Sequence, residues 1–305
     1  MDLFELETFL AVAREKSFSR AAGRLHRTQS AVSQTISKLE GSLGEKLFDR
    51  SSRDGTLTDA GQLLVSYAEE LLNVREEARD ALKEIRLLHR GKLSLAANEF
   101  TSRYLLPVLH RFHRMHPTIR IEVRRGLARE IPSSVLNHNV EFGVVSFRPQ
   151  DEELTSLLLY RDELALIVYP RHPLAQAKKV GIKDLGAESF VAHSVLSPYR
   201  ERVIQAFKKH RTVLHMNIEL PTIEDIKHFV RMENGVALVP LIAVENEVRR
   251  GDLVHVPVPE LAFERKLRIV HRKGAVLTHA GQAFLSTCRA IAQTPHARYM
   301  LQPER

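Results

Sequence analysis

Residues 17–40 read SFSRAAGRLHRTQSAVSQTISKLE, and this stretch decides the fold of the first part of the chain. Ser17 and Thr28 are hydroxyl residues of the kind that cap helix N-termini, so a helix is expected to start after each of them. The second helix ends at Gly44 and has one apolar face, formed by Val32, Ile36, Leu39 and Leu43. Two short helices joined by a tight connection are typical of a helix-turn-helix.

The flanking segments extend this unit to a winged helix-turn-helix. Residues 3–14 are predicted to form an amphipathic helix, because their apolar side chains recur at helical spacing. Residues 46–50 predict a strand, residues 51–55 a turn and residues 56–58 a returning strand. This hairpin is the expected wing, and Arg53 at its tip is predicted to enter a DNA minor groove, where negative potential favours a guanidinium.

Local charge, rather than total charge, points to nucleic acid. The chain has a net charge of +8, but residues 1–58 carry 9 Lys and Arg against 8 Asp and Glu, whereas residues 91–305 carry 31 against 22. Between Lys16 and Leu39, however, there are five Lys or Arg residues, seven Ser or Thr residues and no acid. Such a surface around a helix N-terminus suits phosphate, and amides or hydroxyls in its first turns suit base edges.

The predicted DNA-binding residues are the exposed cations, hydroxyls and amides of this region, namely Ser17, Ser19, Arg20, Arg27, Thr28, Gln29, Ser30, Ser33, Gln34, Lys38 and Arg53. The alternative is an ordinary three-helix module with a solvated basic face. The absence of acids in the stretch, together with the two caps and the wing, favours DNA binding.

Residues 59–90 predict a long helix that pairs with a second copy. Apolar residues follow one another at alternating steps of three and four, at Leu57, Ala60, Leu64, Tyr67, Leu71, Val74, Ala78, Ala81, Ile85 and Leu88. This spacing is the heptad pattern of a coiled coil. The predicted dimerisation residues are Leu64, Tyr67, Leu71, Val74, Ala78 and Ile85. The alternative is one long helix packed on its own domain.

Residues 91–305 alternate between strand and helix patterns, which predicts a parallel α/β sheet. Within this part of the chain, Ser197 and Thr222 are expected to cap helices, and Cys288 lies on the apolar face of a helix over residues 278–293, where it is predicted to pack in the core.

The chain resembles the LysR-type transcriptional regulators. The resemblance rests on FLAVA (9–13), SFSRAA (17–22), QSAVS (29–33), LE (39–40), LG (43–44), LFDR (47–50) and LTDAG (57–61). It implies a winged helix-turn-helix over 1–58, a linker helix over 59–90, and a two-lobed α/β sensor that resembles a periplasmic solute-binding protein. Lobe I would comprise 91–161 and 268–305, and lobe II 162–267. The implied partners are double-stranded DNA with an interrupted inverted repeat, a second copy in a homodimer or a tetramer, an effector, and RNA polymerase.

A small, anionic effector is expected between the lobes, because ligands of open α/β folds sit beyond the strand ends and at helix N-termini. The predicted effector-binding residues are Asn98, Thr101, Ser102, Arg129, Arg148, His193 and Ser197. Phe100 departs from the family, in which many members have serine or threonine at this position. Either Thr101 or Ser102 replaces that hydroxyl, or the ligand is partly apolar or cationic.

Other functions have little support in the sequence. No enzyme motif, cofactor motif or complete metal-ligand set is visible, although His110, His113 and His116 recur every third residue. The longest mostly apolar run, residues 235–244, is far shorter than the ~20 residues of a membrane span. The single cysteine fits a reducing cytoplasm. We therefore expect a cytoplasmic regulator without enzymatic activity or cofactor, and an architectural DNA-binding protein without a ligand as the alternative.

Overall fold

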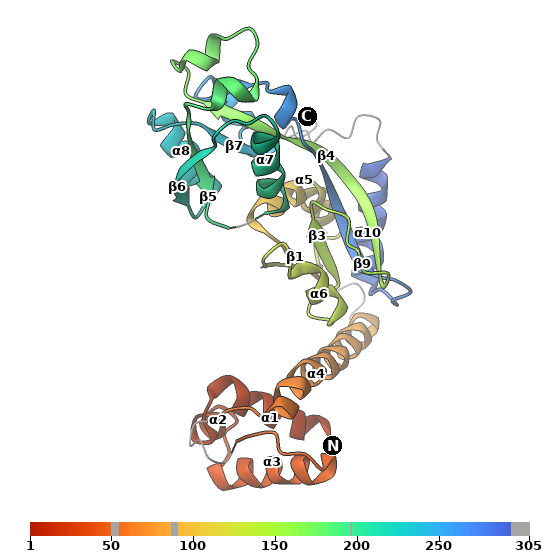
Figure 1. The fold of residues 1–305 in the computed structure, drawn as a ribbon. Coiled ribbons are helices and arrows are strands. Elements are labelled where there is room, and N and C mark those ends of the chain that lie inside the picture. The colour runs from red at the N-terminus through yellow and green to blue at the C-terminus, as the bar shows by residue number, and fades with distance from the viewer. Residues whose placement is uncertain (50–54, 87–90, 196, 294–305) are drawn as a thin grey trace.

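The computed structural model describes residues 1–49, 55–86, 91–195 and 197–293. Its N-terminal module, here called the head, contains α1 (Leu3–Glu15), α2 (Phe18–Arg24) and α3 (Gln29–Leu43) (Figure 1). As predicted, the Ser17 hydroxyl caps α2 and the Thr28 hydroxyl caps α3. The apolar faces of the three helices meet in one core, which includes Leu6, Phe9, Val12, Ile36 and Leu39.

The base of the predicted wing is present as an antiparallel bridge between Phe48 and Leu57. The Asp49 amide donates a hydrogen bond to the Thr56 carbonyl over 2.8 Å, which extends this pairing by one step. The tip of the wing, including Arg53, lies outside the described residues.

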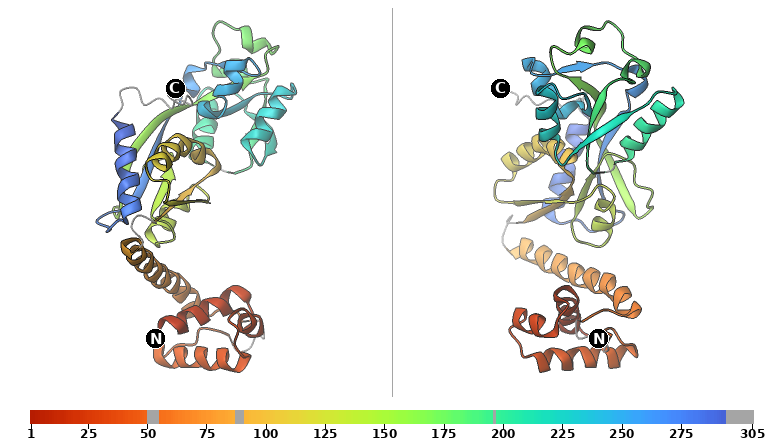
Figure 2. Two further views of the ribbon diagram at one scale, coloured as in Figure 1. Left: turned by 180° about the vertical axis from the view of Figure 1, so that it is seen from behind. Right: turned by 60° about the vertical axis from the view of Figure 1, so that its left-hand side comes forward.

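The linker helix α4 (Asp59–Arg86) runs from the head to the sensor, and both views in Figure 2 show it between these two parts. One face of its first half packs on the head, where Ala68 is fully buried. Gly61 is required at the start of the helix, because a Cβ at this position would lie 2.2 Å from the Leu47 carbonyl oxygen.

Lobe I of the sensor is built on β1 (Lys92–Ala97), β2 (Arg120–Arg125) and β3 (Phe142–Val145). The helices of this lobe are α5 (Glu99–Met115), α6 (Ile131–Leu136) and α10 (His279–Ala292). Strand β9 (Glu264–Arg272) pairs along its whole length with the first part of β4 (Leu154–Val168), and both strands continue from lobe I into lobe II (Figure 1).

Lobe II comprises the far end of β4 together with β5 (Ser189–His193), β6 (His215–Leu220), β7 (Ala237–Pro240) and β8 (Val254–Val256). Its helices are α7 (Pro198–Lys209), α8 (Ile223–Arg231) and α9 (Glu245–Arg250). Four short 3-10 helices, η1 (Pro173–Gln176), η2 (Ile182–Leu185), η3 (Leu241–Ala243) and η4 (Pro259–Leu261), complete the described part of the lobe.

The prediction of a parallel sheet is wrong for the strands that join the lobes. Strands β1 and β2, β1 and β3, and β5 and β6 are parallel, as expected from strand–helix–strand alternation. Strand β9, however, is antiparallel to β3 and β4, and β4 is antiparallel to β7 and β8. The reason is that β4 leaves lobe I and β9 returns to it, so these two crossing strands must run in opposite directions.

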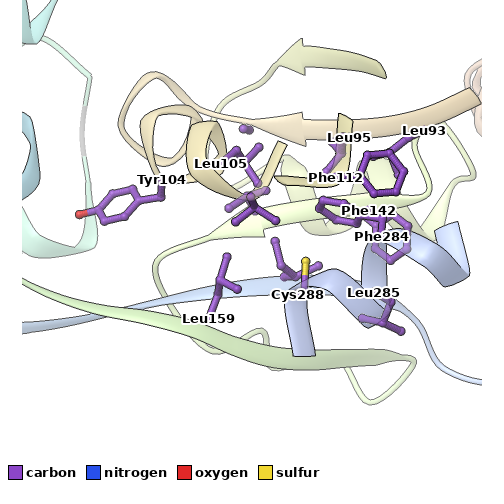
Figure 3. Packing of buried hydrophobic residues seen from close by; sticks show 14 of the residues in the cluster. Leu93, Leu95, Tyr104, Leu105, Phe112, Phe142, Leu159, Phe284, Leu285 and Cys288 are labelled. Atoms are coloured by element: carbon purple, nitrogen blue, oxygen red, sulfur yellow. The ribbon is translucent and has the colours of Figure 1, made fainter. Parts of the chain in front are cut away.

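The lobe I core lies between the sheet and the helices α5 and α10. Figure 3 shows Cys288 packed with the phenylalanines of this core. The rings of Phe112 and Phe284 meet edge to face at 5.7 Å between centroids. The prediction that Cys288 is a core residue is confirmed, because its side chain is fully buried. Among the described helices, none is long and apolar enough to cross a membrane.

Candidate DNA-contact face and interlobe pocket

The candidate DNA-contact face is the side of α3 that faces away from the head core. Val32, Ile36 and Leu39 are buried, and this orientation exposes the other side of the helix. The predicted residues Ser19, Arg20, Arg27, Thr28, Gln29, Ser30, Gln34 and Lys38 are all exposed, and Ser17 and Ser33 are half-buried. The exposed amides and hydroxyls at the start of α3 can reach base edges, because an α-helix fits the major groove.

The cations of this region are held by local contacts. The Arg20 guanidinium donates to the Glu15 carbonyl, and Arg27 lies over the Phe4 ring at 5.5 Å from its centroid. The Lys38 ammonium is 2.9 Å from Glu5, and this contact raises the pKa of Lys38 and lowers the pKa of Glu5. The Lys38 side chain is paired with the first helix in this arrangement but remains largely exposed.

On the linker helix, the exposed stripe of α4 consists of Leu63, Tyr67, Leu71, Val74, Ala78 and Leu82. This stripe differs from the predicted seam near the N-terminal end of α4, because Leu64 is half-buried there and packs against the head core. The predicted Ile85 side chain lies outside the described side chains. A continuous apolar stripe of this kind is suited to a partner helix.

The linker helix also contacts lobe I directly. Glu77 accepts two hydrogen bonds from the Arg272 guanidinium, at 2.7 and 3.0 Å, and lies 2.5 Å from His138 Nδ1. The Asn73 side-chain amide donates to the Asn137 carbonyl over 2.9 Å. The sequence offered no signal for this contact, because Glu77 and Arg272 are 195 residues apart.

A pocket of about 150 Å³ lies between the lobes, where β1, β5 and β7 end. Most of its walls are apolar side chains from both lobes, such as Phe100, Leu127, Val191 and Leu238. Polar groups also reach it from both lobes, with Ser146 on one side and Tyr199 on the other. The two lobes are linked here by the Tyr199 hydroxyl, which donates to the Ser146 carbonyl over 2.8 Å. A concave, mostly apolar site with few polar groups is typical of small-molecule binding.

Only some of the predicted effector-binding residues line the pocket. Asn98, His193 and Ser197 line the pocket, and Ser102 lines an adjacent hollow beside Asn98. Thr101 is fully buried and does not line the pocket. Its hydroxyl donates a hydrogen bond to the Val144 carbonyl over 3.1 Å and accepts one from the backbone amide of Asn98. Arg129 and Arg148 are exposed and outside the pocket lining.

Sequence reasoning missed a buried cluster at the crossing strands. Arg265 lines the pocket, and its Nη1 is 3.2 Å from the Asp162 carboxylate and 3.4 Å from the Tyr104 hydroxyl. Tyr104 also donates to Asp162, and burial raises the pKa of Tyr104 above its ordinary value. Each of the two charges is the middle residue of a charged run, 161–163 or 264–266, so neither stands out in the sequence. The available signal was strand alternation, which places Arg265 on the same face as Leu267 and Ile269.

Glu99 also lines the pocket, although it was not among the predicted effector-binding residues. Its Oε1 accepts a hydrogen bond from the Ile223 backbone amide, the first of α8, over 3.0 Å. Its Oε2 lies 3.5 Å from His193 Nε2 and 3.7 Å from an Arg125 nitrogen. The neighbouring Phe100 ring contacts the His193 ring in a tilted arrangement, at 4.9 Å between centroids.

Comparison with known proteins identifies the class. Residues 3–62 match the family described as bacterial regulatory helix-turn-helix protein, lysR family, and residues 87–293 match the LysR substrate binding domain. A curated relative, the probable RuBisCO transcriptional regulator of Synechocystis sp. (strain ATCC 27184 / PCC 6803 / Kazusa), is 32% identical over 290 residues, which cover 93% of this chain and 84% of the relative.

Solved structures show the same fold. The crystal structure of CbnR, a LysR family transcriptional regulator, matches with a TM-score of 0.73 at 21% identity, over 96% of this chain and 100% of that one. The regulatory domain of CcmR from Synechocystis PCC6803, in complex with 2-PG, matches with a TM-score of 0.60 at 24% identity, over 67% of this chain and 98% of that domain.

The chain therefore belongs to the LysR family of transcriptional regulators. It is a DNA-binding regulator with an N-terminal helix-turn-helix and a C-terminal effector-binding domain.

Proposed function

We propose that this regulator binds an interrupted inverted repeat as a homodimer, and that a small molecule in the interlobe pocket changes how it occupies that site. The observation that carries the DNA part is the exposed start of α3, where Gln29, Ser30 and Gln34 stand clear of the head core. The exposed stripe of α4 supports the dimer, because two copies joined there hold two heads at a set spacing, and a twofold protein favours a twofold site.

For the sensor, we propose lobe I over 91–161 and 268–305, and lobe II over 162–267. This division is supported by separate buried clusters, one around Phe112 and Phe284 and others around Phe207 and Val230. A ligand that contacts both lobes favours one angle between them over another, and this is how it shifts the population of conformations.

We propose a small effector for the pocket that carries an anionic group, with Asn98, His193 and Ser197 among its contacts. Three lining arginines, Arg125, Arg200 and Arg265, against one lining carboxylate support the anionic charge. The CcmR domain, whose structure was determined with 2-PG, supports a small-molecule role for a sensor of this fold. Regulation of transcription brings the protein to the chromosome in the cytoplasm and to RNA polymerase as a partner, without a catalytic step of its own.

A footprint on the DNA upstream of the protein's own gene, repeated over a series of salt concentrations, tests the DNA part. We expect protection of an interrupted inverted repeat that persists at moderate salt. Diffuse protection that disappears as salt is added indicates phosphate contacts alone and supports the architectural alternative, because such binding depends steeply on ionic strength.

A further inference from the structure

The carboxylate of Glu99 lies in surroundings built to hold an anion. The Ile223 amide donates to it over 3.0 Å, and it also faces His193 Nε2 at 3.5 Å and an Arg125 nitrogen at 3.7 Å. These groups come from both lobes, since Glu99 and Arg125 belong to lobe I and the other two to lobe II. The positive end of the α8 dipole points at the same carboxylate and favours its negative charge.

The same turn of α5 carries further contacts between the lobes. The Phe100 ring contacts the His193 ring, and Arg103 forms an ion pair with Glu224 in the first turn of α8. Three of five successive residues of lobe I, Glu99, Phe100 and Arg103, therefore contact lobe II. This turn of α5 therefore holds the two lobes together.

The other lining arginines already have carboxylate partners outside the pocket lining. Arg200 pairs with Glu219, and Arg265 pairs with Asp162 at 3.2 Å. Among the described residues, neither Glu99 Oε2 nor His193 Nε2 has a hydrogen-bond partner, although both atoms are buried. Arg265 Nε is also buried without a hydrogen-bond partner among the described residues, but its side chain is already paired with Asp162. Around Glu99, both the carboxylate and the imidazole that faces it keep hydrogen-bonding capacity, as expected for a position that exchanges one occupant for another.

We propose that the pocket contains a carboxylate-binding position formed by both lobes, and that Glu99 fills it as a tethered carboxylate until an effector carboxylate replaces it. This inference rests on the proposed function, because it takes the interlobe pocket as the effector site. Displacement of Glu99 releases the contact of α5 with the Ile223 amide, so effector binding is coupled to the angle between the lobes.

Chemical rescue by acetate tests the proposal on the purified full-length chain. Glu99→Ala removes the tethered carboxylate, and we expect the thermal unfolding midpoint to fall by about 2–4 °C. Sodium acetate is expected to restore at least half of that shift, relative to sodium chloride at the same ionic strength, because acetate can occupy the vacated position. The wild type should show no such difference between the two salts.

Two further variants make the result specific. Glu130→Ala removes an exposed carboxylate outside the pocket and should show no response to acetate. Glu99→Ser vacates the position while keeping a residue suited to the first turn of a helix, so it should respond to acetate even where the alanine variant folds poorly. The absence of rescue in both Glu99 variants, or equal stabilisation of the wild type by acetate, overturns the proposal.

Because this measurement uses no DNA, its outcome is independent of the footprint. A diffuse footprint removes the proposed function while leaving an acetate response intact. A missing acetate response removes the tethered carboxylate while leaving a sequence-specific footprint intact.

Discussion

Gln29 is the first residue of α3, and its side chain is exposed on the face that is free to enter a major groove. An amide at this position can form two hydrogen bonds with one base, so its loss affects preference more than overall affinity. We expect Gln29→Ala to reduce discrimination at one base pair of each half-site by about 1–3 kcal/mol. Competition between operators that differ in single base pairs, at fixed salt, measures this.

Ser42→Ala provides the matched control, because Ser42 lies on the same helix near its C-terminal end and bonds to the Leu39 carbonyl. The base-pair preference of the Ser42→Ala variant should equal that of the wild type. An unchanged preference in Gln29→Ala assigns base readout to other residues of α3.

Cys288 illustrates how burial decides the chemistry of a single side chain. Burial among the phenylalanines of lobe I raises the pKa of this thiol to about 12, because an apolar surrounding disfavours the thiolate. At pH 8 only about one molecule in ten thousand then carries a thiolate. We expect no alkylation of the folded protein by iodoacetamide and full alkylation in guanidinium chloride, followed by mass spectrometry. Rapid labelling of the folded chain contradicts this expectation.

At the scale of the elements, α4 has two faces with different partners. One packs on the head through Ala68, and the other is the exposed stripe of α4. Leu71→Asp places a charge in the middle of that stripe, and the dimer loses about 1.5–3 kcal/mol of apolar burial for each helix. We expect a shift to monomers at micromolar concentration, measured by analytical ultracentrifugation.

Gln62→Asp serves as the control for this change, because Gln62 is exposed on the same helix but lies outside the stripe. The control should remain a dimer. Should Leu71→Asp also remain a dimer, the partner surface lies elsewhere on the molecule.

At the scale of the whole molecule, the Glu77 contact joins the linker helix to the sensor. Glu77 bonds both to Arg272 at the end of β9 and to His138 after α6. It therefore connects the linker helix to the strand that crosses between the lobes. We expect Glu77→Gln to increase amide hydrogen exchange in the second half of α4 by roughly tenfold, because a charged hydrogen bond contributes about 1.5–3 kcal/mol.

Glu76→Gln is the neighbouring control, since Glu76 pairs with Arg75 and Arg79 of α4 itself. It should leave the exchange rates near those of the wild type. Equal exchange in the two variants indicates that the Glu77 contact does not restrain the helix.

Much of the architecture could be predicted from short stretches of sequence. The caps at Ser17 and Thr28, the Gly44 stop and the core position of Cys288 depend on the nearest few residues or on helical spacing, and the structure agrees with each. Of the predicted α4 seam, Tyr67, Leu71 and Val74 are exposed and stay a prediction for dimerisation, whereas Leu64 packs on the head, because the first half of the helix already has a partner there.

The sequence by itself determined the head helices, because caps and periodicity act over a few residues, and its motifs identified the family. The two lobes of the sensor followed only from the resemblance to that family, because periodicity does not show how strands and helices connect. Only the tertiary structure decided how the pocket is made. The Glu99 contact with the Ile223 amide joins residues 124 positions apart. The Thr101 hydroxyl is unavailable to a ligand because it donates a hydrogen bond to the Val144 carbonyl, 43 positions away. Which polar group remains available to a ligand depends on partners that only folding brings within hydrogen-bond distance.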